Sequence, residues 1–144
     1  VFASNLNNYA GLYVSMLSLA LNLKRPDLCT VHVIVAHSEL DQANNLVRCL
    51  KQDLVDKQAS KLKVSLHIRR EFWKTDRKTR KYFRKYTHNQ SLGSFTFVRY
   101  YLPDYFPTLK RVLWLDTDII LKADVAPLYR MVMKHPLAGP TTPR

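Results

Sequence analysis

The sequence predicts an α/β fold with a mainly parallel central sheet and flanking helices, and three observations support this prediction. Short apolar runs alternate with amphipathic helical stretches from the start of the chain. One run, residues 30–36, is rich in β-branched residues, as a buried strand should be. Another, residues 111–115, leads directly into Asp116-Thr117-Asp118. Such a run is typical of a strand buried on both faces of a sheet.

Length and composition restrict the function classes. The 144 residues are enough for one domain with a single core. With only 3 glycines, the chain has neither a Gly-x-Gly-x-x-Gly turn nor a Walker A loop, so a bound phosphate would need a metal ion or basic side chains. The net charge of +12 favours a polyanionic partner: nucleic acid, acidic polysaccharide or anionic lipid head groups. Cys29 and Cys49 are compatible with one disulfide or with two buried thiols.

The first third of the chain predicts a strand, a helix and a second strand. The chain begins without methionine, inside an expected strand over residues 1–4, which suggests a piece of a longer protein. We expect Asn7 or Asn8 to cap the helix and Pro26 to end it, before the strand over residues 30–36. The apolar positions at helical spacing are Tyr9, Leu12, Tyr13, Met16, Leu17, Ala20 and Leu21.

A second helix and a third strand follow. Ser38, with Glu39 and Asp41 after it, predicts a helix start. The apolar face of this helix is Leu40, Ala43, Val47, Leu50 and Leu54. Residues 62–68 alternate with a period of two, which predicts a strand that is half exposed or at an edge.

Residues 69–90 break the alternation of strands and helices. They carry nine basic side chains against two acidic ones, a net of +7 out of the chain's +12, with aromatic residues between the charges. This texture suits stacking on a polyanion and neutralising it, including single-stranded nucleic acid. The alternative is a solvated surface insertion whose aromatic side chains pack onto the rest of the domain.

The last third predicts several short elements. Residues 94–102 are expected to form a helix that Pro103 and Pro107 end. Its expected apolar face is Phe95, Val98 and Leu102. A short strand is expected over residues 119–121, and residues 137–139 could begin another. Between them, Asp124 should cap a turn of helix over residues 126–129.

The Asp116-Thr117-Asp118 turn is the strongest candidate for a functional site. In open α/β sheets, ligands bind beyond the carboxyl ends of the strands. Two acids spaced i, i+2 at such a place can hold a hard divalent cation through oxygen, and that cation could bridge the diphosphate of a nucleotide. The alternative is that Asp116 caps a turn while Asp118 is a solvated surface acid.

Three stretches in order form a recognisable set. They are Arg99-Tyr100-Tyr101-Leu102-Pro103, residues 110–120, and Asp124-Val125-Ala126-Pro127-Leu128-Tyr129. The set resembles glycosyltransferase family 8, which includes glycogenin, bacterial lipopolysaccharide galactosyltransferases and plant galacturonosyltransferases. The opening Val1-Phe2-Ala3, followed by Asn8-Tyr9, is similar to that family's first strand and nucleotide-binding turn. The basic segment is the part least like the family.

The resemblance implies a GT-A (Rossmann-like) nucleotide-diphospho-sugar transferase fold. Residues 1–144 would be its N-terminal nucleotide-sugar-binding part, with a basic insertion at about 69–90. The implied activity is that of a retaining hexosyltransferase, which moves a sugar from a UDP-sugar to a saccharide acceptor with Mn²⁺ or Mg²⁺ as cofactor. An anionic polysaccharide is one candidate acceptor, and no nucleic-acid partner is expected. A lumenal Golgi location, through a membrane anchor absent from this chain, is implied by analogy.

The resemblance also assigns roles to residues. Asp116 and Asp118 would hold the metal on the two phosphates, with Thr117 between them in the nucleotide site. Tyr9 would stack on the uracil ring with Asn8 beside it, and the alternative for Tyr9 is a core aromatic at a helix start. Another role falls to Arg99, which would reach the nucleotide sugar or else form a surface salt bridge.

The sequence departs from the family in two places. Asn5, Leu6 and Asn7 replace acidic residues often seen in the first turn, although asparagine side chains can still form hydrogen bonds. The family's second half, with its Asn-Ser-Gly stretch, later metal-binding histidine and basic residue for the diphosphate, has no counterpart before Arg144. The five histidines present match no such motif, so no catalytic residue is assigned.

Two other hypotheses remain open. One is a noncatalytic module that binds polyanions or nucleic acid through residues 69–90, with an affinity that falls steeply with salt. The other is an inactive, truncated copy of a transferase. The carboxylate pair favours the transferase, because a protein that binds a polyanionic backbone has no reason to place two acids at the end of a buried strand.

Overall fold

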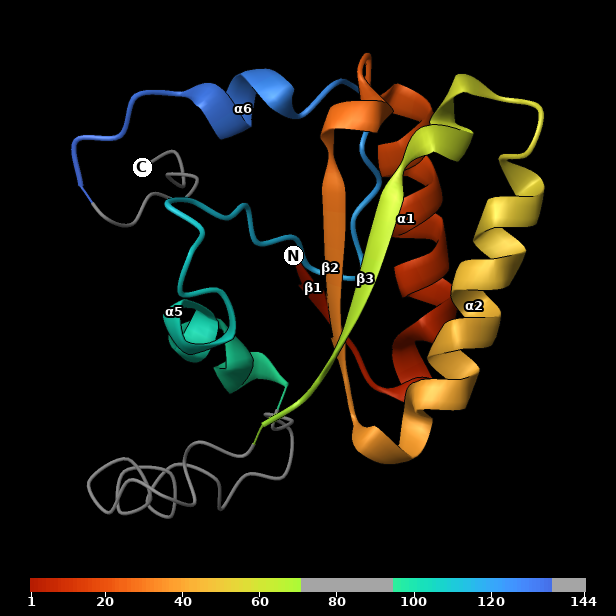
Figure 1. Ribbon diagram of the computed structural model, residues 1–144, viewed down its shortest axis with the longest axis horizontal. Coiled ribbons are helices and arrows are strands. Elements are labelled where there is room, and N and C mark those ends of the chain that lie inside the picture. The colour runs from red at the N-terminus through yellow and green to blue at the C-terminus, as the bar shows by residue number, and fades with distance from the viewer. Residues whose placement is uncertain (71–94, 136–144) are drawn as a thin grey trace, which may run out of the picture.

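A three-stranded parallel sheet lies between the helices of the described structure (Figure 1). The computed structural model describes residues 1–70 and 95–135. The strands are β1 (Phe2–Ala3), β2 (Thr30–Val35) and β3 (Lys63–Ile68), and they lie in the order β1-β2-β3. All neighbouring strands are parallel, as the alternation of apolar runs and helical stretches predicts.

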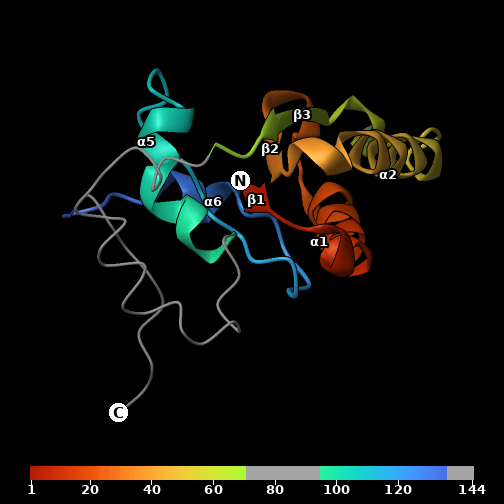
Figure 2. The ribbon, with the colours of Figure 1, turned by 90° about the horizontal axis from the view of Figure 1, so that it is seen from below.

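Helices cover both faces of this sheet. The helices α1 (Tyr9–Asn22) and α2 (Leu40–Asp53) lie on one face, and the short helix α5 (Leu102–Tyr105) lies on the other, as Figures 1 and 2 show from two directions. The fold is therefore a mixed α/β arrangement with a parallel sheet, in agreement with a partial GT-A fold.

Two hydrophobic clusters form the core, one on each face of the sheet. The larger lies under α1 and α2 and contains Phe2, Tyr9, Leu12, Met16, Leu19, Ala20, Val31, Val33, Val35, Ala43, Leu50, Leu54, Ala59 and Leu62. The smaller contains Ile34, Val98 and Phe106, with Val112 and Trp114 packed against it. The strand β2 supplies both clusters because successive side chains on a strand point to opposite faces.

The two long helices agree closely with the predicted ones. In α1 the positions Leu12, Met16 and Ala20 are buried, but Leu21 is 50% exposed and does not belong to the apolar stripe. Asn8 precedes the helix without making a side-chain capping hydrogen bond. The helix ends at Asn22, where the following Leu23 is extended, and not at Pro26.

The predicted strand over residues 111–115 is not formed as a regular strand in the described chain. Its backbone makes two hydrogen bonds beside β1: the Leu115 N–H donates to the Val1 carbonyl at 3.0 Å, and the Val1 nitrogen donates to the Leu113 carbonyl at 2.6 Å. Trp114 packs on the smaller cluster and Leu115 on the larger one. The side chains thus alternate as in a strand, but each is only half buried, so the prediction of full burial is wrong.

The short strand predicted over residues 119–121 is also absent from the structure. Pro103, expected to end a helix, lies instead in the first turn of α5, where a proline needs no hydrogen-bond partner for its nitrogen. The preceding residues form a 3₁₀-helix, η5 (Thr96–Tyr101). As predicted, Asp124 stabilises a helix start: its Oδ1 accepts a hydrogen bond from the Ala126 N–H at 3.0 Å, at the beginning of α6 (Ala126–Arg130).

Three remaining expectations concern the basic segment, the C-terminal end and the cysteines. Nearly all of residues 69–90, and the whole of residues 137–139, lie outside the described residues. Cys29 and Cys49 are free thiols, and Cys49 is exposed on α2, so neither a disulfide nor a pair of buried thiols is found. In the two described ranges we find no helix with the length and apolar character needed to cross a membrane.

Candidate functional site

The Asp116-Thr117-Asp118 turn packs against the first half of α1. A β-carbon added to Gly11 would lie 2.6 Å from the carbonyl oxygen of Thr117, closer than real β-carbons approach. Gly11 therefore permits a contact between two backbones that any larger residue would prevent. This contact sets the position of the turn along the axis of α1, at the level of Gly11.

A polar stripe on α1 holds the residues that follow the turn. The buried hydroxyl of Ser15 lies 2.7 Å from the Ile119 carbonyl oxygen and 3.0 Å from that of Thr117. One helical turn later, the Ser18 hydroxyl accepts a hydrogen bond from the Leu121 N–H at 3.0 Å. The Asn22 amide then donates to the Leu121 carbonyl at 2.9 Å.

This stripe explains why residues 119–121 form no strand: side chains of α1 satisfy their backbone groups, in place of a neighbouring strand. Sequence reasoning missed the stripe, although a signal was present. Gly11, Ser15, Ser18 and Asn22 recur at helical spacing in an otherwise apolar helix.

Asp116 and Arg99, two of the predicted site residues, lie together. Asp116 Oδ1 accepts a hydrogen bond from the indole N–H of Trp114 at 2.9 Å, and the Arg99 guanidinium lies 3.6 Å from the same oxygen. The guanidinium also stacks over the Trp114 ring, 5.3 Å from its centroid. Arg99 therefore forms the salt bridge weighed as its alternative, with a predicted site residue as its partner.

Asp118 is exposed on the other side of Thr117 in the same turn, and the Asp116 side chain is 57% exposed. Both carboxylates are thus accessible to an ion from solvent. In the described part of the chain, no group of three or more His, Cys, Asp or Glu side chains could hold a metal ion. An ion held by Asp116 and Asp118 would therefore take its remaining ligands from elsewhere, such as phosphate oxygens and water.

Tyr9 occupies the position that its core alternative describes. Its side chain is only 9% exposed and belongs to the larger cluster. The hydroxyl donates a hydrogen bond to the Glu39 carbonyl oxygen at 3.3 Å, and burial, together with Glu39, raises the pKa of Tyr9 to about 12. Little of the ring is open for stacking in this conformation. Asn8, beside it, is exposed.

Two buried oxygen atoms near Tyr9 have no hydrogen-bond partner among the described residues: Asn5 Oδ1 and Glu39 Oε2. Asn5 follows β1 and Glu39 follows β2, so both lie at the carboxyl ends of neighbouring parallel strands. Buried polar atoms are nearly always paired, so an unpaired acceptor indicates a place for a ligand or water that donates a hydrogen bond. By sequence, Asn5 is a departure from the family that can still form hydrogen bonds, Glu39 is part of a helix start, and neither is assigned to the site.

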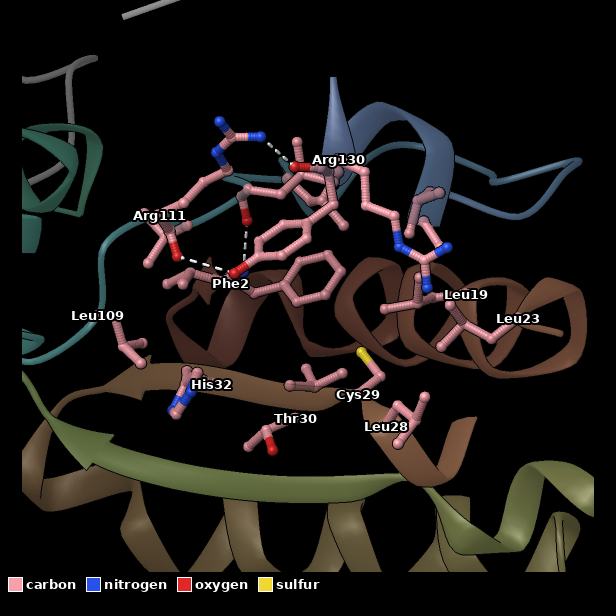
Figure 3. Close-up of a pocket in the computed structure, with 18 of the residues that line it drawn as sticks. Phe2, Leu19, Leu23, Leu28, Cys29, Thr30, His32, Leu109, Arg111 and Arg130 are labelled. Atoms are coloured by element: carbon pink, nitrogen blue, oxygen red, sulfur yellow. Dashed lines mark hydrogen bonds between the residues drawn. The ribbon is translucent and has the colours of Figure 1, made fainter. Parts of the chain in front are cut away.

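A well-formed cavity in the described part of the chain lies elsewhere. It has a volume of about 430 Å³ and is lined largely by apolar side chains near the amino end of β2, among them Leu19, Leu23 and Leu28 (Figure 3). Arg111 closes one side of it, because its guanidinium donates hydrogen bonds to the Tyr129 and Met131 carbonyls. This cavity is at the opposite end of β2 from Glu39, so it is not part of the candidate site.

Comparison with known proteins gives a family match over nearly the whole chain. A model of glycosyl transferase family 8 matches residues 1–142. Among curated proteins, the human "Glycosyltransferase 8 domain-containing protein 1" is 36% identical over 45 residues, which are 31% of this chain and 12% of that protein. "Probable galacturonosyltransferase 4" of Arabidopsis thaliana is 34% identical over 55 residues, which are 38% of this chain and 9% of that protein.

A third relative, "Probable galacturonosyltransferase 12" of Arabidopsis thaliana, is 38% identical over 42 residues. The matched stretches thus span about a tenth of the length of these curated relatives. No solved structure is significantly similar to the chain.

Proposed function

Since the chain belongs to glycosyl transferase family 8, whose model matches residues 1–142, we propose that it forms the donor-nucleotide-binding part of a glycosyltransferase. The donor is a UDP-sugar, and the acceptor is a saccharide. The proposal depends on one observation above all: the turn that carries two exposed carboxylates contacts α1 at Gly11, close to the end of the helix that Asn5 precedes and where Tyr9 bonds to Glu39.

The nucleoside would bind at the carboxyl ends of β1 and β2. Asn5 Oδ1 and Glu39 Oε2 lack hydrogen-bond donors among the described residues, and uridine offers the N–H of its base and the hydroxyls of its ribose. Ligands of open α/β sheets bind at this edge of the sheet. Stacking of the base on Tyr9 would require that residue to become more exposed than the 9% observed.

The diphosphate would lie near the Asp116-Thr117-Asp118 turn. The Tyr9 hydroxyl reaches Glu39 and Gly11 touches Thr117, so the nucleoside end and the turn both contact the first turn of α1, from different sides of the helix. The amino end of a helix also favours anions, because its first N–H groups lack partners inside the helix.

A divalent cation suits the donor atoms of this turn. Asp116 and Asp118 offer carboxylate oxygens, which Mg²⁺ and Mn²⁺ prefer as ligands. When bound, such a cation neutralises the charge that builds on a leaving diphosphate. The roles of this chain's residues are to hold the cation and orient the nucleotide, and we assign no catalytic residue to it.

The family resemblance suggests that a hexose is transferred with retention of its anomeric configuration. The net charge of +12 is consistent with an anionic polysaccharide as acceptor, since charge of one sign attracts ligands of the other.

The test is titration calorimetry of the full chain with UDP, with and without Mn²⁺. We expect binding that requires Mn²⁺, and at least a tenfold loss of affinity in Asp118→Asn, because one of two carboxylate ligands becomes a neutral amide. The matched control is Asp104→Asn, which makes the same change at an exposed acid on α5 and should leave the affinity unchanged. UDP binding that is equally tight without Mn²⁺, or in Asp118→Asn, would contradict the metal role.

A further inference from the structure

Trp114 connects the smaller hydrophobic cluster with the candidate metal site. Its side chain packs against a cluster that contains Ile34, Val98 and Phe106. Its indole nitrogen reaches beyond that cluster and donates a hydrogen bond to Asp116 Oδ1 at 2.9 Å. One side chain is therefore held by the core and also contacts a proposed cation ligand.

The contacts of Asp116 are unequally divided between its two oxygens. Oδ1 has the indole N–H at 2.9 Å and the Arg99 guanidinium at 3.6 Å. Within residues 1–70 and 95–135, the indole hydrogen bond reaches Oδ1 and no hydrogen bond is found at Oδ2. Holding a carboxylate by one oxygen fixes its rotation and leaves the other oxygen directed at solvent or at a ligand.

We infer that Trp114 is a positioning residue for the cation site: its N–H fixes the Asp116 carboxylate so that Oδ2 is the cation ligand. The inference rests on the proposed function, since it concerns the same cation. Groups that orient metal ligands through hydrogen bonds commonly change metal affinity by about 10- to 100-fold when they are removed.

The geometry favours Trp114 over Arg99 in this role. The distance of 3.6 Å between Arg99 and Asp116 exceeds that of a hydrogen bond, and both side chains are well exposed. Ion pairs of this kind are screened by water and salt. The indole is anchored by its packing, so its N–H stays directed at Asp116 whether or not Arg99 moves to a bound nucleotide.

The experiment measures Mn²⁺ affinity directly, from the electron paramagnetic resonance signal of free Mn²⁺, with UDP present and the full chain as the protein. In Trp114→Phe the ring still fills the cluster but the N–H is lost, so we expect Mn²⁺ affinity to fall about tenfold or more. Trp73→Phe makes the same chemical change at the other tryptophan, outside the described residues, and should leave the affinity within twofold.

The outcomes separate this inference from the proposed function. If Asp118→Asn loses Mn²⁺ binding while Trp114→Phe keeps it within twofold, the positioning role is overturned and the metal site stands. If the unmodified chain with UDP binds no Mn²⁺, the proposed function fails and the positioning role fails with it.

If urea unfolding shows that Trp114→Phe does not fold, a second measurement, of tryptophan fluorescence, tests the positioning role of Trp114. In Trp73→Phe, Trp114 is the one remaining tryptophan. We expect saturable quenching of its fluorescence by paramagnetic Mn²⁺ and not by Mg²⁺. Binding of Mn²⁺ without such quenching would place the ion away from Trp114 and overturn the inference.

Discussion

A single glycine controls how closely the acidic turn approaches α1. The Thr117 carbonyl oxygen lies 2.6 Å from the place that a β-carbon on Gly11 would take. Taken alone, this glycine carries no signal in the sequence, because an isolated glycine in a helical stretch is tolerated and usually only lowers helix propensity; its spacing to Ser15, Ser18 and Asn22 is the signal that was missed. The position of the turn relative to Tyr9 and Glu39 depends on it.

We predict that Gly11→Ala destabilises the protein. A glycine-to-alanine change inside a helix normally stabilises it by about 1 kcal/mol, through helix propensity. Here the added carbon would lie 2.6 Å from a backbone oxygen, and overpacking of this kind costs about 1–3 kcal/mol. Urea unfolding would measure the change, with Val14→Ala at an exposed position of α1 as the control. A Gly11→Ala protein more stable than the unmodified chain by about 1 kcal/mol, as helix propensity alone predicts, would show that the turn moves away without cost.

At the residue scale, the sequence named candidate site residues whose roles stay predictions. It singled out Arg99 and Asp116, which the structure places together, but not Trp114, which joins them. It also weighed Tyr9 as either a stacking or a core residue, and the side chain lies in the core. The partner of a polar side chain depends on which distant segments meet, and a local pattern does not contain that information.

Among the elements, α1 has two faces that contact different parts of the protein. One face is apolar and fills the larger cluster, while Ser15, Ser18 and Asn22 bind the backbone of the segment after the acidic turn. Periodicity predicted the first face, apart from Leu21, because burial of an amphipathic helix follows from its own sequence. The polar face could be recognised only from the structure, because the backbone that it binds lies about a hundred residues away in the sequence.

The register of β2 and β3 brings two histidines together. His32 lies opposite Ser65 and His67 opposite Ile34, so the two rings are diagonal neighbours with a nitrogen–nitrogen distance of 2.9 Å. Phe106 packs on both rings, with centroid distances of 4.7 and 5.0 Å. Burial lowers the pKa of both, assisted by His67 in the case of His32 and by Arg70 in the case of His67.

We predict that stability falls on acidification through the histidine range. The pKa of each ring is lower in the folded state than its ordinary value of about 6.5, so the unfolded chain binds more protons. The contribution of the two histidines to the free energy of unfolding is therefore fully present above about pH 6.5 and decreases as the pH falls toward their folded-state pKa values. Urea midpoints at a series of pH values measure the slope.

The control for this prediction is another histidine. His67→Gln should flatten the pH dependence of the urea midpoint, whereas His37→Gln, at an exposed position in the 3₁₀-helix η3 (His37–Glu39), should leave it as steep as before. Equal slopes in the two variants would remove the histidine pair as the source.

For the molecule as a whole, the net charge of +12 is a property that no single element explains. Much of it comes from residues 69–90, most of which lie outside the described residues. Charge of this size attracts polyanions without a specific site. Binding driven by it must therefore be distinguished from binding of a nucleotide at the acidic turn.

We predict that the chain binds heparin, an anionic polysaccharide, and that the affinity falls steeply as the salt concentration rises. Salt shortens the range of electrostatic attraction from about 10 Å at 0.1 M to about 3 Å at 1 M. Elution from a heparin column measures this, and a neutral dextran column is the control. Asp118→Asn should not weaken heparin binding. Retention that is unaffected by salt would show that something other than charge holds the polysaccharide.

The sequence by itself determined the α/β class, the two long helices, the edge strand β3 and the family, because these follow from local periodicity and from an ordered set of motifs. Only the tertiary structure decided that residues 119–121 form no strand and that Trp114 holds Asp116. Whether an extended segment joins a sheet depends on which groups satisfy its backbone. Here those groups come from α1, brought there by folding over about a hundred residues of sequence separation.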